Sequence, residues 1–318
     1  MKGYEKGTLV VSSSPHISDS ITTSKIMRDV IIALVPALLA STYFFGPRVL
    51  ILVTVCILSS LAFEYLFNIV TKREQTIQDL SPVVTGMLLA FNLPSNFPYW
   101  MAIIGCFVAI VIVKQLFGGI GQNFVNPAMT ARVILLISFA TPMTSWPTVN
   151  RVLSAADAVT AATPLFLLKK GDIGNLPTNF QLLMGGIGGS LGETCAFALI
   201  IGGLYLIYRK VITITIPLSF LGTMVVFSLI VGVDPVFQIL AGGAILGAFF
   251  MATDYSTSPI TNTGKIVFGI GCGLLTMMIR LYGSYPEGVS FAILFMNIVT
   301  PHIDNLSRRR LYGGAKGE

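Results

Sequence analysis

The sequence predicts an all-α polytopic membrane protein with about ten transmembrane helices. Of its 318 residues, 54% are hydrophobic and only 11% are charged, and the mean hydropathy is +0.81. Soluble globular domains carry about 25% charged residues, so this composition excludes that class. The apolar residues also gather in blocks long enough to cross a bilayer, which takes about 20 helical residues.

The ten apolar blocks follow a polar N-terminal segment. This segment has no apolar stretch typical of a signal peptide, so we expect residues 1–24 to form a cytoplasmic tail. Pro, Gly and Asn occupy joints between the blocks, as at Asn92-Leu93-Pro94 and Val233-Asp234-Pro235, and these residue types favour helix ends. The expected helices cover residues 28–46, 48–70, 77–94, 98–117, 127–143, 190–208, 211–232, 235–251, 263–282 and 287–305.

The blocks divide into two halves of five helices. An odd number of spans gives the second half the opposite orientation, which is the pattern of inverted-repeat transport folds. The third helix of each half runs into an irregular polar stretch, at Asn92–Ser95 and at Ala252–Pro259. We therefore predict a tail (1–24), a first half (25–143), an external connection (144–189), a second half (190–307) and a C-terminal tail (308–318).

The basic residues predict which segments face the cytoplasm. With the N-terminus inside, fifteen of the 20 Lys and Arg residues lie on the inside, and Arg48, Arg151, Lys169, Lys170 and Arg280 lie outside. This bias follows the positive-inside rule and places both termini in the cytoplasm. The net charge of +6 therefore indicates a membrane surface rather than nucleic acid. Trp100 and Trp146 fit interfacial anchors.

Four cysteines lie singly inside apolar runs, at Cys56, Cys106, Cys195 and Cys272. They have neither metal-ligand spacing nor a disulfide pattern, so we interpret them as small buried residues. We do not expect a metal site or an iron–sulfur cluster held by this chain alone.

A loop between the fourth and fifth helices is the first candidate binding segment. It reads Gly118-Gly119-Ile120-Gly121-Gln122-Asn123-Phe124-Val125-Asn126-Pro127, and its glycines predict irregular backbone. Such backbone persists at membrane depth only inside protein or beside a cavity. Asn123 and Asn126 offer donors and acceptors suited to a flavin ring edge or a ribityl chain, or they cap an exposed loop.

A glycine-rich segment, residues 185–193, opens the sixth helix. It is not a dinucleotide loop, because no βαβ unit surrounds it. Its small residues allow close helix packing, which we favour. The alternative is that its backbone amides lie near a flavin phosphate.

Seven charged residues fall within or at the ends of the apolar blocks. Each should face protein, water or a partner charge, because exposure to lipid is costly. Asp79, Glu193 and Asp254 are the candidates for a cation or proton path; the alternative is that they sit at interfacial helix ends and snorkel or pair, or, for Asp254, that the carboxylate hydrogen-bonds local amides. The full set is Glu64, Asp79, Lys114, Arg132, Glu193, Asp254 and Glu287.

The external connection contains Asp157-Ala158-Val159-Thr160-Ala161-Ala162-Thr163-Pro164. A threonine between alanines and a proline is also typical of a helix start or a turn. The whole pattern, however, is similar to sites at which a flavin transferase attaches FMN to a threonine hydroxyl through its phosphate. That chemistry needs an accessible hydroxyl between small neighbours.

These segments together resemble the D subunits of Rnf complexes and, more distantly, the B subunit of the sodium-pumping NADH:quinone oxidoreductase. The absence of a long N-terminal extension favours the Rnf family. Further matching motifs are Ser81-Pro82-Val83-Val84-Thr85-Gly86, Ala252-Thr253-Asp254 with Ser258-Pro259, and Tyr285-Pro286-Glu287-Gly288.

The resemblance implies covalent FMN on Thr163, with Asp157 and Thr160 belonging to the attachment pattern, and non-covalent riboflavin near Asn123 and Asn126. It implies a bacterial inner-membrane complex that couples electron transfer between ferredoxin and NAD to Na⁺ or H⁺ transport. The partners would be other membrane and peripheral subunits, including an FMN-carrying subunit and iron–sulfur subunits, and a flavin transferase for maturation.

Two other classes remain open from the residues alone. A cofactor-free inverted-repeat transporter or channel for a small solute would suit ten helices with intramembrane charges, but it has no use for the 157–163 pattern. A structural membrane anchor would not need irregular polar backbone at two depths.

Overall fold

The protein is helical throughout most of the residues described, which are 22–147, 160–172, 174, 176–283 and 287–307 of a computed structural model. Each of the ten apolar blocks contains at least one helix, so the predicted all-α class is confirmed. The helical elements are α1 (Thr23–Phe45), α2 (Arg48–Val70), η1 (Ile77–Asp79), α3 (Ser81–Phe91), α4 (Tyr99–Phe107), η2 (Val108–Gln115), α5 (Pro127–Ser138), α6 (Ala140–Met143), α7 (Pro164–Lys170), α8 (Asn179–Met184), η4 (Leu191–Glu193), α9 (Ala196–Tyr208), α10 (Thr215–Val231), α11 (Pro235–Leu240), α12 (Ala244–Leu246), η5 (Gly247–Met251), α13 (Asn262–Tyr282) and α14 (Val289–Ser307).

Four helices in the described part of the chain are long and apolar enough to cross a membrane: α1, α2, α13 and α14. The other blocks hold shorter or interrupted helices. In two of them α-helix passes into π-helix, at η2 and η5. The chain is therefore a multi-pass membrane protein, whereas the number of ten spans stays a prediction.

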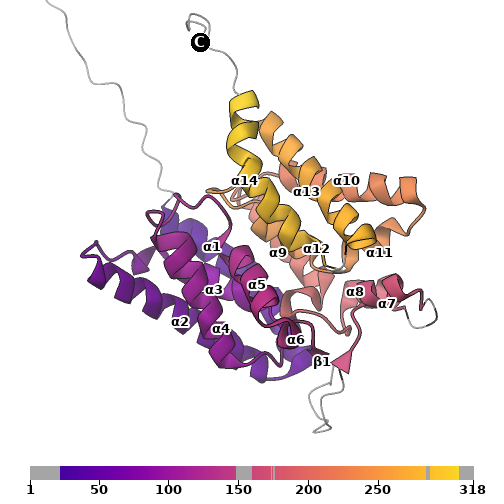
Figure 1. Cartoon of the computed structure of the whole chain (residues 1–318), viewed down its shortest axis with the longest axis horizontal. Helices are drawn as coiled ribbons and strands as arrows, with labels where there is room; N and C mark the ends of the chain where they lie inside the picture. The colour runs from indigo at the N-terminus through magenta and orange to yellow at the C-terminus, as the bar shows by residue number, and fades with distance from the viewer. Residues whose placement is uncertain (1–21, 148–159, 173, 175, 284–286, 308–318) are drawn as a thin grey trace, which may run out of the picture.

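The two halves lie side by side (Figure 1), with the first coloured indigo to magenta and the second orange to yellow. Within the first half α2 packs against α3 and α4, and within the second half α10 packs against α13. Between the halves, α1 packs against α9 and α5 packs against α14. A site at this boundary therefore receives side chains from both ends of the sequence.

The third block of each half is interrupted. Helix α3 has 11 residues. At a rise of about 1.5 Å per residue it covers about 16 Å, roughly half of a hydrocarbon core of about 30 Å. The second interruption lies between α11 and α12, where Gly242 and Gly243 both have positive φ. The sequence did not predict this break. It placed irregular backbone after residue 251, in the turn that follows η5.

Arg280 of α13 supplies hydrogen-bond donors to the backbone carbonyls at the second interruption. Its guanidinium donates to the backbone carbonyls of Gln238, Ala241 and Gly242 at 2.5, 2.9 and 3.0 Å. A helix interruption inside the hydrocarbon core needs such side-chain donors, because no water is present there to hydrogen-bond the free backbone carbonyls. Arg280 is only 4% exposed. Arg280 thus serves the buried backbone, and its position on the outer side of the membrane stays a prediction.

The predicted external connection is more ordered than a polar loop. It contains a two-residue pairing of β1 (Trp146–Pro147) with β2 (Thr160–Ala161) and the short helices α7 and α8. Leu165 and Leu182 from these helices pack with Phe237 and Ala241 at α11. Trp146 is only 7% exposed, so its prediction as an interfacial anchor was wrong, whereas Trp100 is 55% exposed.

Side-chain hydrogen bonds join segments that the charge rule assigns to the same face. Ser24 donates to the carbonyl of Gln78, both expected inside, and Arg48 donates to the carbonyl of Asn96, both expected outside. Arg209 pairs with Asp29 at 3.1 Å, again within one expected face. The contacts thus group the segments as predicted. Which of the two faces is cytoplasmic stays a prediction.

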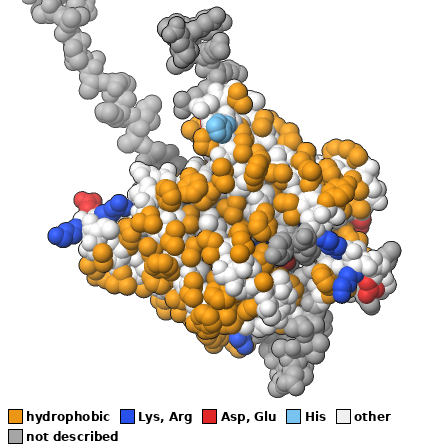
Figure 2. All heavy atoms as spheres, in the orientation of Figure 1, with side chains coloured by type: hydrophobic (Ala, Val, Ile, Leu, Met, Phe, Trp, Pro, Cys, Tyr) orange, Lys and Arg blue, Asp and Glu red, His pale blue; other side chains and the backbone are white. Residues whose placement is uncertain are grey.

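Apolar side chains cover most of the visible surface over the helices, and charged side chains gather near its edges (Figure 2). Leu39, Leu58, Leu218 and Ile298 are examples with more than half of their surface exposed. Large exposed apolar surface of this kind is expected where a protein faces lipid.

Candidate functional site

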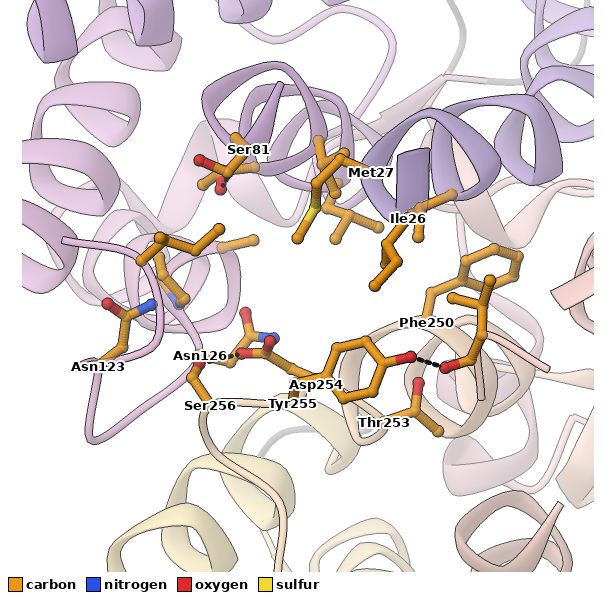
Figure 3. A pocket seen from close by; sticks show the side chains of 18 of the residues that line it. Ile26, Met27, Ser81, Asn123, Asn126, Phe250, Thr253, Asp254, Tyr255 and Ser256 are labelled. Carbon is orange, nitrogen blue, oxygen red and sulfur yellow. Dashed lines mark hydrogen bonds between the residues drawn. The ribbon is translucent and has the colours of Figure 1, made fainter. Parts of the chain in front are cut away.

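A cavity of about 360 Å³ lies between the two halves, at the end that we predict to be cytoplasmic. Pockets of about 300–1,000 Å³ are typical of small-molecule sites. Figure 3 shows Ser81, Met27 and Ile26 on one side of this inner cavity and Asp254 and Tyr255 on the opposite side. Its walls come from α1, α3, η2, the 116–126 connection, the start of α5, the end of α9, η5 and the turn after η5.

Asn123 lines this cavity and has one polar atom without a partner in the described part of the chain. Its Oδ1 is buried and makes no hydrogen bond to any residue that the structure describes. A buried acceptor without a donor costs about 1–3 kcal/mol. In Figure 3 the amide nitrogen of Asn123 points toward the cavity and the oxygen points away from it, so the side chain offers an N–H donor to the cavity.

Asn126 also lines the inner cavity, yet its amide already has structural partners. Its Oδ1 caps α5 by accepting from the backbone N–H of Met129, and its Nδ2 donates to the carbonyl of Met251 at the end of η5. The two predicted asparagines thus differ. Asn126 ties the first half to the second, and Asn123 retains a free acceptor.

Lys114 places a buried ammonium at the cavity wall. Its Nζ lies 2.6 Å from Oε2 of Glu64 and 2.5 Å from Oγ of Ser81. The Ser81 hydroxyl donates in turn to Oδ1 of Asp79, and the Thr76 hydroxyl donates to the other oxygen of Glu64. Asp79 is therefore one end of a polar network that reaches the cavity, and it also accepts from the backbone N–H of Ser81 at the start of α3.

Asp254 lines the same cavity, in the connection between η5 and α13. Its Oδ2 accepts from the hydroxyls of Ser256 and Thr257 at 3.0 and 3.2 Å. Burial raises the pKa of Asp254, and these hydroxyl hydrogen bonds offset part of the rise because they favour the carboxylate. Both roles predicted for this residue, local capping and a cation or proton site, are compatible with this geometry.

A second buried charge cluster surrounds Arg132, away from the inner cavity. Its guanidinium donates to Glu287, to Asn92 Oδ1 at 3.1 Å and to Ser290 Oγ at 3.0 Å. Glu193 Oε1 lies 3.9 Å from the same guanidinium and has no hydrogen bond to a described residue. The third ion-path candidate, Glu193, therefore belongs to a different site from Asp79 and Asp254.

Thr163 is the N-cap of α7. Its Oγ1 accepts from the backbone N–H of Phe166 at 3.3 Å, and the residue is 4% exposed. The expectation of an accessible hydroxyl is therefore wrong for the packed chain, because the following Leu165 is buried with the α11 residues. Thr160 begins β2, and Asp157 lies outside the described residues.

A second cavity of about 340 Å³, called the outer cavity because it lies in the connection that we predict to be external, is close to Thr163 in the chain. The neighbours of Thr163, Ala162 and Pro164, line this cavity, and Gly186 and Gly188 form another part of its wall. Gly185, in contrast, is a packing position: a Cβ there would lie 2.6 Å from the carbonyl oxygen of Thr194. The glycine-rich segment thus combines close packing at its start with a cavity wall beyond it.

Sequence reasoning missed which charges pair. It required partners for the intramembrane charges, but it could not match Lys114 with Glu64, since the two residues are 50 positions apart. Nor did it show that Asn126 has structural hydrogen-bond partners whereas the side-chain oxygen of Asn123 has none among the described residues. The only local signal was the Asn-Pro step at residue 126, which is typical of a helix N-cap followed by Pro at N1.

Comparison with known proteins agrees with these features. A model of the NQR2, RnfD, RnfE family matches residues 10–313. The D subunit of the Na⁺-translocating ferredoxin:NAD⁺ oxidoreductase complex of Acetobacterium woodii is 51% identical over 310 residues, covering 97% of this chain and 96% of that protein. The D subunit of the proton-translocating ferredoxin:NAD⁺ oxidoreductase complex of Clostridium ljungdahlii is 41% identical, with 97% of each chain covered.

A third relative, the D subunit of the ion-translocating oxidoreductase complex of Aliivibrio salmonicida, is 36% identical over 96% of this chain and 99% of its own length. The resemblance expected from the sequence motifs is thereby confirmed. Because the family match and all three relatives extend over nearly the whole chain, this protein belongs to the NQR2, RnfD, RnfE family.

Proposed function

We propose that this chain is a membrane subunit of an ion-translocating ferredoxin:NAD⁺ oxidoreductase complex, with FMN attached to Thr163 and riboflavin held in the inner cavity. The observation that carries the proposal is the presence of two cavities at opposite predicted faces of one membrane subunit. One is lined by Ala162 and Pro164, the two neighbours of Thr163, and the other is lined by Asn123. Flavins supply the electron-transfer chemistry when bound, and the protein supplies their placement and electrostatics.

The inner cavity supports the riboflavin part of the proposal through its lining. Ile26, Met27 and Phe250 provide apolar contacts for a flat ring system. Asn123 provides an amide N–H, and the hydroxyls of Thr85 and Thr253 provide further polar contacts. Small-molecule sites combine a mainly apolar wall with a few polar groups in this way.

The outer cavity supports the FMN part through its position. Its wall includes Ala162 and Pro164, the residues on both sides of Thr163, so the cavity lies beside the backbone at the attachment position. The hydroxyl itself is buried in the packed chain and already caps α7. We therefore place attachment before the external connection packs against α11, when a transferase can reach the side chain.

For ion translocation, the proposal assigns candidate roles to Asp254 and Asp79 at the inner end and to Glu193 in the Arg132 cluster. Buried carboxylates in membrane proteins are costly and commonly serve ion or proton paths. The names of the relatives include one Na⁺-translocating and one proton-translocating complex, so they support transport of either ion.

The proposal places the chain in a bacterial inner membrane with both termini in the cytoplasm. Its partners are the other membrane and peripheral subunits, including an FMN-carrying subunit and iron–sulfur subunits, and a flavin transferase during maturation. The charge bias of the sequence and the multi-subunit names of the relatives support this assignment.

The direct test is flavin analysis of the purified complex. The denatured chain should fluoresce in a gel under ultraviolet light, and mass spectrometry should find the added mass on the peptide that contains Thr163. Acid extraction of the native complex should release riboflavin. A chain without bound or extractable flavin would contradict the proposal and favour the cofactor-free transporter.

A further inference from the structure

We propose that the carboxylate of Glu193 sets the reduction potential of the flavin attached at Thr163, by acting through the glycine-lined wall of the outer cavity. This inference rests on the proposed function, in which FMN is attached beside that cavity. It gives Glu193 an electrostatic role toward the cofactor, in addition to its candidate place in the ion path.

The carboxylate of Glu193 lies directly behind the wall of the outer cavity. Gly188 lines the cavity, and a Cβ at the next residue, Gly189, would lie 3.1 Å from Oε2 of Glu193. Consecutive Cα atoms are about 3.8 Å apart, so about one residue of backbone separates this carboxylate from the cavity wall. Because both residues are glycines, no side chain of theirs lies between the charge and the cavity.

The other carboxylate oxygen of Glu193 approaches the cavity from the side of α7. Pro164 lines the cavity, and the next residue, Leu165, packs so closely on Gly242 that a Cβ there would overlap its side chain. A Cβ at Gly243 would lie 2.8 Å from Oε1 of Glu193. The start of α7 and the carboxylate of Glu193 thus contact neighbouring residues of the same helix interruption.

The charge of Glu193 is buried and only partly neutralised. The residue is 7% exposed, and its Oε1 makes no hydrogen bond to any residue that the structure describes. The guanidinium of Arg132 lies 3.9 Å away, but it donates to Glu287. The second buried arginine, Arg280, donates to backbone carbonyls of the helix interruption. Two arginines and two ionised glutamates make this cluster neutral overall, so Glu193 carries its negative charge within it.

A fixed negative charge behind the cavity wall opposes the arrival of an electron at the cavity. At an effective dielectric constant of about 20, two unit charges about 10 Å apart change an equilibrium constant roughly tenfold. By reciprocity, an electron on the flavin raises the affinity of Glu193 for a positive charge by the same factor. The carboxylate therefore links reduction of the covalent flavin to a residue of the candidate ion path.

The test is the midpoint potential of the covalent flavin in the purified complex. A redox titration follows flavin absorbance, and the signal that Thr163→Ala lacks is assigned to the covalent flavin. In Glu193→Gln the equilibrium constant for one-electron reduction should rise about tenfold, which raises the midpoint potential by about 59 mV. Glu193→Asp retains the charge, so its potential should stay near the wild-type value.

Two further variants test where the charge acts. Gln181 lines the outer cavity and belongs to the capping box of α8, a position that Glu also suits. Gln181→Glu should therefore lower the potential and leave the helix folded. Asp234→Asn removes an exposed carboxylate, and it should leave the potential unchanged because water screens that charge.

The outcomes separate this inference from the proposed function. Equal potentials in the wild type and Glu193→Gln would overturn the inference, as would an equal shift in Asp234→Asn. If Glu193→Gln does not mature, Gln181→Glu decides, and an unchanged potential there overturns the inference. A complex without covalent flavin would instead contradict the proposed function. In-gel fluorescence of each variant confirms that the chain has folded and matured.

Discussion

At the scale of single residues, Thr163 holds a hydroxyl that already has a structural partner. Its Oγ1 caps α7 through Phe166, and 4% of the residue is exposed. A phosphodiester at this atom would place anionic oxygens at the N-terminus of α7, where they can accept from the free backbone amides. Because the hydroxyl is buried in the packed chain, we place attachment before packing, when a transferase can reach it.

Thr163→Ala should abolish covalent flavin and leave the chain inserted in the membrane. Loss of the cap costs about 0.5–2 kcal/mol, a local effect at a short helix. Thr178→Ala is the matched control, because Thr178 caps α8 in the same connection through Gln181. In-gel fluorescence should vanish in the first variant and remain in the second. Undiminished fluorescence in Thr163→Ala would place the flavin elsewhere.

Asp254→Asn distinguishes the two roles open to that carboxylate. If Asp254 serves only its turn, the amide oxygen can still accept from Ser256 and Thr257. If it handles the transported ion, as proposed, the neutral side chain should reduce ion uptake per electron while both flavins remain bound. The measurement is ion uptake by the reconstituted complex in vesicles. An unchanged ratio would move attention to Asp79 and Glu193.

At the scale of elements, the interrupted segment α11–α12 depends on one side chain from another helix. Arg280 supplies the donors for three backbone carbonyls that a continuous helix would have satisfied itself. The same segment receives Leu165 and Leu182 from the external connection. The packing of the outer cavity wall is thus coupled to this break in the second half.

Arg280→Met should destabilise the protein markedly, because each unpaired buried carbonyl costs about 1–3 kcal/mol. Arg280→Lys keeps a cation with fewer donors, so its stability should lie between that of Arg280→Met and that of the native protein. Arg209→Met is the control: this arginine pairs with Asp29 with an exposed side chain, and exposed pairs contribute about 0–1 kcal/mol. The check is thermal unfolding in detergent. Equal midpoints for Arg280→Met and Arg209→Met would contradict the role.

At the scale of the whole molecule, two half-structures enclose the inner cavity between them. Side chains of α1, α3 and η2 meet side chains from the end of α9 and from η5 across this space. Polar contacts also join the two halves across this boundary, such as the hydrogen bond from Asn126 to the carbonyl of Met251. A relative movement of the halves would therefore change the inner cavity and the Arg132 cluster together.

The sidedness of the molecule gives a prediction at this scale. A reporter fused after Lys170 should be external, and a reporter fused after Lys210 should be cytoplasmic. The reason is the excess of Lys and Arg in segments assigned to the inside. Alkaline phosphatase and green fluorescent protein fusions measure the two locations. The same location for both reporters would overturn the assignment.

The sequence by itself determined the membrane class, the positions of the helical blocks and the family. These follow from local properties: runs of apolar residues, Gly and Pro at the joints, and short motifs. Helix caps at Asn126 and Thr163 are local in the same sense, since each acts on an amide three residues ahead. Only the tertiary structure decided that Lys114 meets Glu64, that Arg280 supports a helix break and that Trp146 is buried. It alone distinguished Asn123, with its free acceptor, from Asn126. These outcomes depend on which helix faces pack together, and a run of uniformly apolar residues carries little information about that choice.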